Sequence, residues 1–187
     1  MGFLGHFYGI ETTNHKTAKA IKKGMEPTRL LNGILEARSY FKNNYRKIYK
    51  GSIGLVLGLP HETKDTIQQG LNWLENNWEG ESCVVSALEI PTDPTIDVLS
   101  DLSYKWGDYG YKEYKGTDRY QALDFNLNEG HMNSLLIWEN EHLNFYEALK
   151  IADDWRLRMD QESKFAISVF AIDYLTSRGI PLEVALN

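Results

Sequence analysis

The sequence predicts an α/β fold of parallel β/α units, in which three apolar strands alternate with helices. Residues 53–57 are apolar or glycine at every position, which is typical of a strand covered on both faces of a parallel sheet. A tight turn and a helical pattern follow, and a second nearly unbroken apolar run occupies residues 83–90. Strands that alternate with helices of this length pair in parallel through right-handed crossovers.

The composition is that of an ordinary globular protein and excludes some classes of function. The chain has 187 residues, 42% hydrophobic and 25% charged, which suffices for a core of its own. A formal net charge of −6 and a pI of about 5.4 give no general basic field, so no nucleic-acid partner is expected. No segment has the length of a membrane span and no signal peptide is recognisable, so we expect a cytoplasmic protein with no membrane partner.

Cys83 is the only cysteine of the sequence. A single cysteine rules out an intrachain disulfide, and it rules out any all-cysteine metal or cluster site made by this chain alone. The histidines have no spacing typical of a metal-binding helix. We therefore predict no metal site within the chain.

The first predicted strand covers residues 7–10 and ends at Glu11, where a run of polar residues begins. A short helix over residues 15–23 should stop at Gly24, because glycine readily ends a helix. Pro27 fits the first position of a longer helix, whose apolar residues recur on one face up to Tyr45.

The central strand must end by Leu59, because Pro60 has no N–H to donate to a neighbouring strand. Thr63 is then well placed to cap a helix. The apolar side chains of that helix recur at helical spacing and are Ile67, Leu71, Leu74 and Trp78. The sequence therefore predicts a strand, a tight turn and a helix, in that order.

The last predicted strand covers residues 83–90 and ends at Pro91. The chain beyond is less regular, and residues 104–116 carry five aromatic side chains among glycines and charges. These aromatics could line a substrate pocket, but a local cluster under an irregular loop is the favoured interpretation. They are Tyr104, Trp106, Tyr109, Tyr111 and Tyr114.

The remainder is predicted to be helical. Ser134 is expected to cap a helical region that runs to about Met159, and residues 165–175 read as a second, strongly apolar helix. The chain then divides into β/α units over residues 1–95, an irregular aromatic-rich segment over 96–130 and a helical C-terminal region over 131–187.

Three short motifs lie at the ends of the predicted elements: GIET at residues 9–12, KG at residues 23–24 and GLPHET at residues 58–63. Together they resemble the second half of the core of radical S-adenosylmethionine (radical SAM) enzymes. In that family, Gly-Ile-Glu-Ser ends the fourth strand, Lys-Gly follows a short helix, and Gly-Leu-Pro-x-Glu-Thr follows the fifth strand. The resemblance covers residues 7–95, about half of the chain, and implies that residues 1–95 correspond to strands 4 to 6.

The resemblance has one large departure. The family holds a [4Fe-4S] cluster through Cys-x-x-x-Cys-x-x-Cys after its first strand, and this chain has neither the motif nor the strands before residue 7. The implied fold is a partial, half TIM-like barrel of parallel β/α units followed by a helical C-terminal region. The cluster would not be ligated by this chain, and a partner chain would carry the cysteine motif.

The resemblance implies an S-adenosylmethionine site at the carboxyl ends of the strands. Glu11 would hydrogen-bond the ribose hydroxyls, since a carboxylate suits two vicinal donors; the alternative is a helix-capping or loop role. The segment of Gly54, Val56 and Gly58 would lie against the adenine, and close helix packing is the equal alternative. The backbone at Ile90 and Pro91 would lie near the adenine edge.

Two neighbouring residues of the central turn have less specific roles. Glu62 matches the family glutamate, but the favoured interpretation is that it fixes the turn. His61 could face the cofactor or, as readily, the solvent.

Two hypotheses about function follow from these patterns. The chain is the S-adenosylmethionine-binding half of a radical SAM enzyme, inactive alone and dependent on a partner segment with the [4Fe-4S] cluster. The alternative is a non-catalytic remnant or a scaffold subunit of half-barrel fold.

Overall fold

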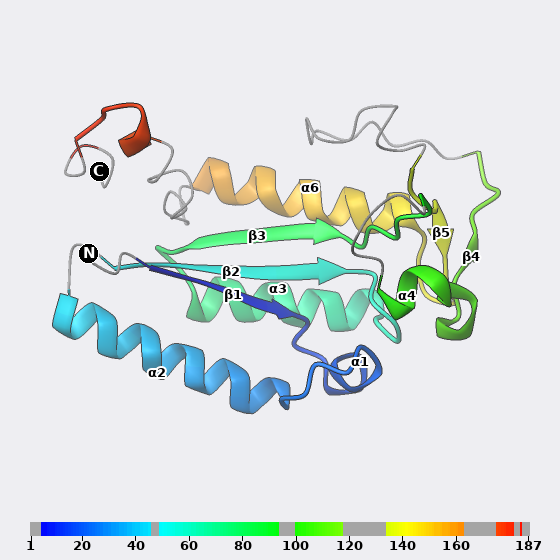
Figure 1. The fold of residues 1–187 in the computed structure, drawn as a ribbon, viewed down its shortest axis with the longest axis horizontal. Coiled ribbons are helices and arrows are strands. Elements are labelled where there is room, and N and C mark those ends of the chain that lie inside the picture. Colours follow the sequence, from blue (N-terminus) through cyan, green and yellow to red (C-terminus); the bar gives the residue numbers. More distant parts are fainter. Residues whose placement is uncertain are drawn as a thin grey trace.

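A three-stranded parallel sheet forms the centre of the computed structural model, which describes residues 5–45, 49–93, 100–117, 134–162, 175–181 and 184. Its strands are β1 (Gly5–Glu11), β2 (Lys50–Leu57) and β3 (Ser82–Ala87), in that spatial order. Helices α1 (His15–Ala20) and α2 (Pro27–Tyr45) connect β1 to β2, and α3 (Lys64–Asn77) connects β2 to β3 (Figure 1). The predicted α/β fold of parallel β/α units is confirmed, and within the described ranges the sheet does not close into a barrel.

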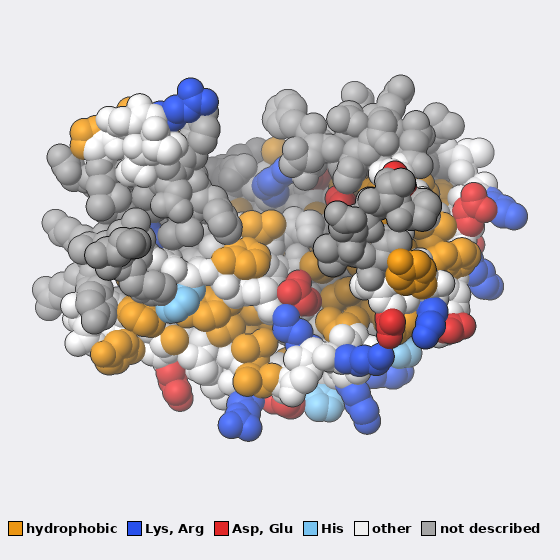
Figure 2. Space-filling view, viewed as in Figure 1, with side chains coloured by type: hydrophobic (Ala, Val, Ile, Leu, Met, Phe, Trp, Pro, Cys, Tyr) orange, Lys and Arg blue, Asp and Glu red, His pale blue; other side chains and the backbone are white. Residues whose placement is uncertain are grey.

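The helices gather on one face of the sheet. Ile53, Leu55 and Leu57 of β2 are all less than 5% exposed, and a Cβ added at Gly70 of α3 would meet the Leu55 side chain at 3.7 Å. Alternate residues of β2 point the other way, so Gly54 lies on the opposite face. Seen from the side on which the strands lie in front of α3, hydrophobic side chains gather near the middle of the molecule (Figure 2).

The rest of the described chain builds short elements and one long helix. These are α4 (Asp101–Tyr104), the 3-10 helix η1 (Trp106–Tyr109), the antiparallel pair β4 (Lys112–Glu113) and β5 (Trp138–Glu139), and α6 (Phe145–Glu162). The pair β4–β5 lies beyond the carboxyl ends of β2 and β3, and α6 runs back along β3 (Figure 1). Lys64 and Glu147 join α3 to α6 by an ion pair of 2.7 Å.

Most predicted boundaries near the central turn are confirmed. Thr63 caps α3 through its side chain, and Ile67, Leu71 and Leu74 are buried. Pro27 begins α2, and a Glu26 side-chain oxygen accepts from the Arg29 N–H at 2.9 Å.

Three predicted boundaries are wrong. The helix expected over residues 15–23 ends at Ala20, and the strand expected over residues 83–90 ends at Ala87. The helix expected from Ser134 begins at Phe145 instead. Residues 135–139 are extended before it, because Leu135 pairs with Pro91 and the Leu136 N–H donates to the Ile90 carbonyl at 2.8 Å.

Some predictions fall on residues that are not described. Most of the helix expected over residues 165–175 lies outside the described ranges, as does much of the segment 96–130. No helix in the described part of the chain is both long and apolar enough to cross a lipid bilayer.

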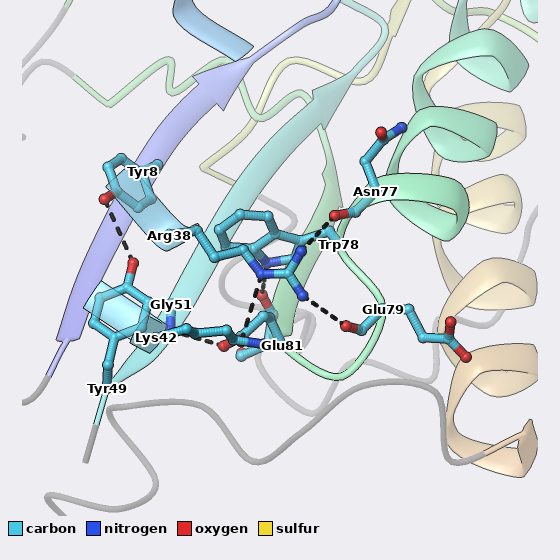
Figure 3. Close-up of polar contacts among 10 residues, drawn as sticks. Tyr8, Arg38, Lys42, Tyr49, Gly51, Asn77, Trp78, Glu79 and Glu81 are labelled. Atoms are coloured by element: carbon cyan, nitrogen blue, oxygen red, sulfur yellow. Dashed lines mark hydrogen bonds and ion pairs between the residues drawn. The ribbon is translucent and has the colours of Figure 1, made fainter. Parts of the chain in front are cut away.

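A buried carboxylate organises the amino-terminal edge of the sheet (Figure 3). Glu81 is 1% exposed, accepts from the Gly51 N–H at 3.0 Å, and forms ion pairs with Lys42 and, at 3.6 Å, with Arg38. The Arg38 guanidinium lies 5.0 Å from the centre of the Trp78 ring. It also donates to the backbone carbonyl of Asn77, the last residue of α3, and to that of Glu79 just beyond it. This network joins α2 and α3 to β2 at the edge opposite to that where parallel sheets bind ligands.

Candidate functional site

The carboxyl edge of the sheet carries the residues that the motifs single out. The loop after β1 begins at Glu11, the turn after β2 covers residues 58–63, and residues 88–91 follow β3. Because all three strands are parallel, these loops lie at one edge of the sheet (Figure 1). Backbone groups beyond the last sheet hydrogen bonds are available to ligands there.

Glu62 ties the first two loops together. The side chain is buried, and its Oε1 accepts from Thr12 Oγ1 at 2.7 Å. Its Oε2 accepts from the backbone N–H groups of Gly58 at 2.9 Å and Leu59 at 3.2 Å. Burial raises the pKa of Glu62 to about 7, against the opposing effect of these three donors. The prediction that Glu62 fixes the turn is confirmed.

Glu11 is held in an uncommon backbone conformation at the end of β1. Its φ is 64°, in the left-handed region that residues with a side chain rarely adopt. One carboxylate oxygen, Oε1, lies 3.2 Å from Lys23 Nζ, which also donates to the Gly9 carbonyl at 2.5 Å. A Cβ at Gly9 would lie 2.5 Å from the same Oε1, so Glu11 folds back over a position that only glycine leaves open.

The helix-capping alternative for Glu11 is wrong. Asn14 caps α1, because its side-chain oxygen accepts from the Thr17 N–H at 3.0 Å. None of the described helices is capped by Glu11, whereas its ion pair with Lys23 is a loop contact of the kind that the other half of the alternative names.

Gly54 and Val56 lie within β2, whereas Gly58 follows it. A Cβ at Gly54 would lie 2.8 Å from the ring of Phe7, so that ring sits directly over the glycine. Val56 is partly buried. Gly58 has a φ of 91°, and a Cβ there would lie 2.2 Å from the Trp138 ring. Gly58 therefore lies in the turn and not in the strand that holds Gly54 and Val56, and an aromatic side chain fills the space beside each glycine.

The backbone after β3 is engaged with the chain around β5. Ile90 is fully buried, its carbonyl accepts from Leu136, and Pro91 pairs with Leu135. Trp138 Nε1 donates to the Leu88 carbonyl at 2.8 Å. Of the six predicted contacts, the structure groups Glu11, Gly54 and Val56 on β1 and β2, and it packs Gly58, Ile90 and Pro91 against residues 135–138.

Three residues that shape this edge were not predicted as part of the site, namely Tyr111, Trp138 and Lys23. Tyr111 is 1% exposed and donates from its hydroxyl to the Gly58 carbonyl at 2.7 Å. Its place in the aromatic-rich segment fits the predicted local cluster, whereas Trp138 stands alone in the sequence and gave no signal. Lys23 belongs to the Lys-Gly motif, so the sequence did mark this residue, although it did not predict the contact with Glu11.

A groove of about 400 Å³ adjoins this edge. His61 contributes to it from the turn after β2 in a left-handed conformation, with a φ of 68°. The other lining residues come from the end of α1, from η1 and from the turn before α6, and are Ala20, Asp108, Tyr109, Gly110, Asn140, Glu141 and His142. Within the described ranges, no three His, Cys, Asp or Glu side chains converge as a metal site requires.

Comparison with known proteins adds no identification. No family model, no curated protein and no solved structure matches the chain.

Proposed function

We propose that this chain is the S-adenosylmethionine-binding half of a radical SAM enzyme, inactive alone, whose [4Fe-4S] cluster is carried by a partner segment. The observation that carries the proposal is the Glu11 carboxylate. It stands at the end of β1, folds over Gly9 and keeps one oxygen on Lys23. Among described residues, its second oxygen accepts no hydrogen bond.

The arrangement of the sheet supports a half barrel. The sheet order follows the chain order, and the connecting helices lie on one face, as in barrels of β/α units. Within the described ranges, β1 and β3 each pair with β2 alone, so both can accept a further strand. We infer that these three units form one half of a six-unit barrel and that β1 is the strand next to the partner.

The residues of this chain do not fit the cluster itself. Cys83 is the only cysteine, it lies in β3, and burial raises the pKa of its thiol far above the usual range. Fe–S clusters need several thiolate ligands. When a partner supplies the cluster, its chemistry is one-electron reduction of S-adenosylmethionine, which yields a 5′-deoxyadenosyl radical and methionine.

The role proposed for this chain is to bind and orient the nucleoside. Glu11 accepts hydrogen bonds from the two ribose hydroxyls, and Val56 supplies an apolar wall. Phe7 stands over Gly54 and is 49% exposed, so this aromatic ring is accessible for contact with a planar base. None of these three side chains carries out bond cleavage, because the cofactors supply that chemistry.

The alternative is a non-catalytic scaffold subunit of half-barrel fold. Its support is the packing at Gly58 and Ile90, where Trp138 and Leu136 occupy positions that the resemblance assigns to the adenine. The two functions make opposite predictions for nucleoside chemistry in the presence of a cluster-carrying partner.

Co-expression tests the proposal. A reading frame that encodes the Cys-x-x-x-Cys-x-x-Cys motif, sought first beside the gene for this chain, is expressed with it and the pair is reconstituted anaerobically with iron and sulfide. Reduction in the presence of S-adenosylmethionine should release 5′-deoxyadenosine. Glu11→Gln should reduce the yield, and the matched control Glu79→Gln, an exposed side chain at the amino edge, should not. A folded, cluster-loaded pair that releases none would refute the proposal and favour the scaffold.

A further inference from the structure

Lys23 has contacts that an exposed lysine at a helix end would not have. Its side chain is 27% exposed, and the ammonium group bridges the Gly9 carbonyl and Glu11 Oε1. The neighbouring Lys22 points elsewhere, since its 75% exposed side chain pairs with Asp101 at 3.1 Å. The two adjacent lysines therefore have different environments.

The backbone around this contact is strained on both sides. Glu11 and Lys22 both have left-handed φ angles, 64° and 56°, although neither is glycine. Residues with a side chain seldom adopt this conformation, and such strained residues concentrate at functional sites, where the surrounding structure holds them in place. The turn at Lys22 follows the C-cap of α1, Ile21, and directs Lys23 back toward the end of β1, where its ammonium reaches Glu11.

The contact has two consequences for the carboxylate. Lys23 holds Oε1, so the direction of Oε2 is set before a ligand binds. Less side-chain entropy of Glu11 is then lost on binding. The ammonium also offsets the negative charge, so the site attracts a cation less strongly than an isolated carboxylate does. A neutral hydroxyl donor is the ligand that fits such a group.

We infer that Lys23 is the positioning residue for Glu11, which it holds so that Oε2 accepts hydrogen bonds from the neutral vicinal hydroxyls of a ribose. The inference rests on the proposed function. It assigns to Lys23 no contact with the reacting atoms.

The test compares adenosine with 2′-deoxyadenosine as ligands of the full chain, by isothermal titration calorimetry. The wild type should bind adenosine about tenfold more tightly, because a hydrogen bond to a charged group is lost with the 2′-hydroxyl. In Lys23→Met the preference should fall below about twofold, because Glu11 is no longer held. Lys23→Arg should restore most of it, and Lys22→Met is the matched control that should keep the wild-type ratio.

The outcomes separate this inference from the proposed function. A Lys23→Met variant that melts as a folded protein and keeps the wild-type ratio would overturn the role of Lys23 and leave the ribose site intact. If Lys23→Met does not fold, Lys23→Arg is the deciding variant, because it keeps the positive charge. Loss of the preference for adenosine in folded Lys23→Arg would also overturn the role of Lys23. A wild type that binds neither nucleoside, or both equally, would contradict the ribose site itself and the inference with it.

Discussion

Thr12 and Glu62 join the ends of neighbouring strands through a buried hydrogen bond of 2.7 Å between Thr12 Oγ1 and Glu62 Oε1, although they are 50 residues apart in the sequence. Thr12 directly follows Glu11, and Glu62 also receives the N–H groups of Gly58 and Leu59. The position of Glu11 is therefore coupled to the turn after β2.

Thr12→Val should destabilise the fold by about 1 to 3 kcal/mol, because it removes one of three donors to a buried carboxylate. The free energy of unfolding from urea denaturation measures the loss. Thr117→Val is the control, since Thr117 is exposed and should change stability little. Equal stability of Thr12→Val and the wild type would show that the hydrogen bond contributes nothing.

Glu62→Gln should change how stability depends on pH. The pKa of Glu62 is about 7 in the folded chain against an ordinary value of 4.5, so the folded state binds this proton more tightly. Its contribution to stability is full below the ordinary value and is lost as pH rises through about 7, by at most about 3 kcal/mol. Urea denaturation at about pH 5 and about pH 8 should show a larger loss for the wild type than for Glu62→Gln. Parallel losses in both proteins would rule out a raised pKa.

Gly58→Ala should cost more stability than Gly110→Ala. Both glycines have left-handed φ angles, 91° and 85°, so both substitutions introduce backbone strain. A Cβ at Gly110 meets nothing within 4 Å, whereas one at Gly58 would lie 2.2 Å from the Trp138 ring. The difference between the two losses isolates the clash and should be about 1 to 3 kcal/mol. Thermal or urea unfolding measures it, and equal losses would mean that Trp138 moves aside freely.

Glu81→Ala should destabilise the chain without altering the carboxyl edge. It removes the acceptor of the Gly51 N–H and the partner of Lys42 and Arg38, which should cost about 2 to 4 kcal/mol, less than a fully buried pair since Lys42 is 41% exposed. Glu79→Gln is the exposed neighbour for comparison. The folded variant should keep the wild-type ratio of adenosine to 2′-deoxyadenosine binding, and a changed ratio would show coupling between the two edges.

The parts of the fold that local sequence decides were predictable. Pro60 has no N–H and so limits β2 to residues before it, and β2 ends at Leu57; Thr63 starts α3 because its side chain caps the helix. The end of the first strand at Glu11 was likewise predicted, because a run of polar residues begins there, and β1 does end at Glu11.

The parts that distant contacts decide were not predictable. The apolar run after β2 continues to Ile90, yet β3 ends at Ala87, because the Leu88 carbonyl binds the Trp138 ring nitrogen and the Ile90 carbonyl binds Leu136. The start of α6 had a local signal that was overlooked. Asn144 and Glu147 cap it reciprocally, each N–H donating to the other side chain at 2.9 Å.

The measurement that tests the central claim most directly is the release of 5′-deoxyadenosine by this chain, co-expressed and reconstituted with a partner that carries the cysteine motif. The account predicts release on reduction with S-adenosylmethionine, a smaller yield from Glu11→Gln and an unchanged yield from Glu79→Gln. A folded and cluster-loaded pair that leaves S-adenosylmethionine intact would contradict it.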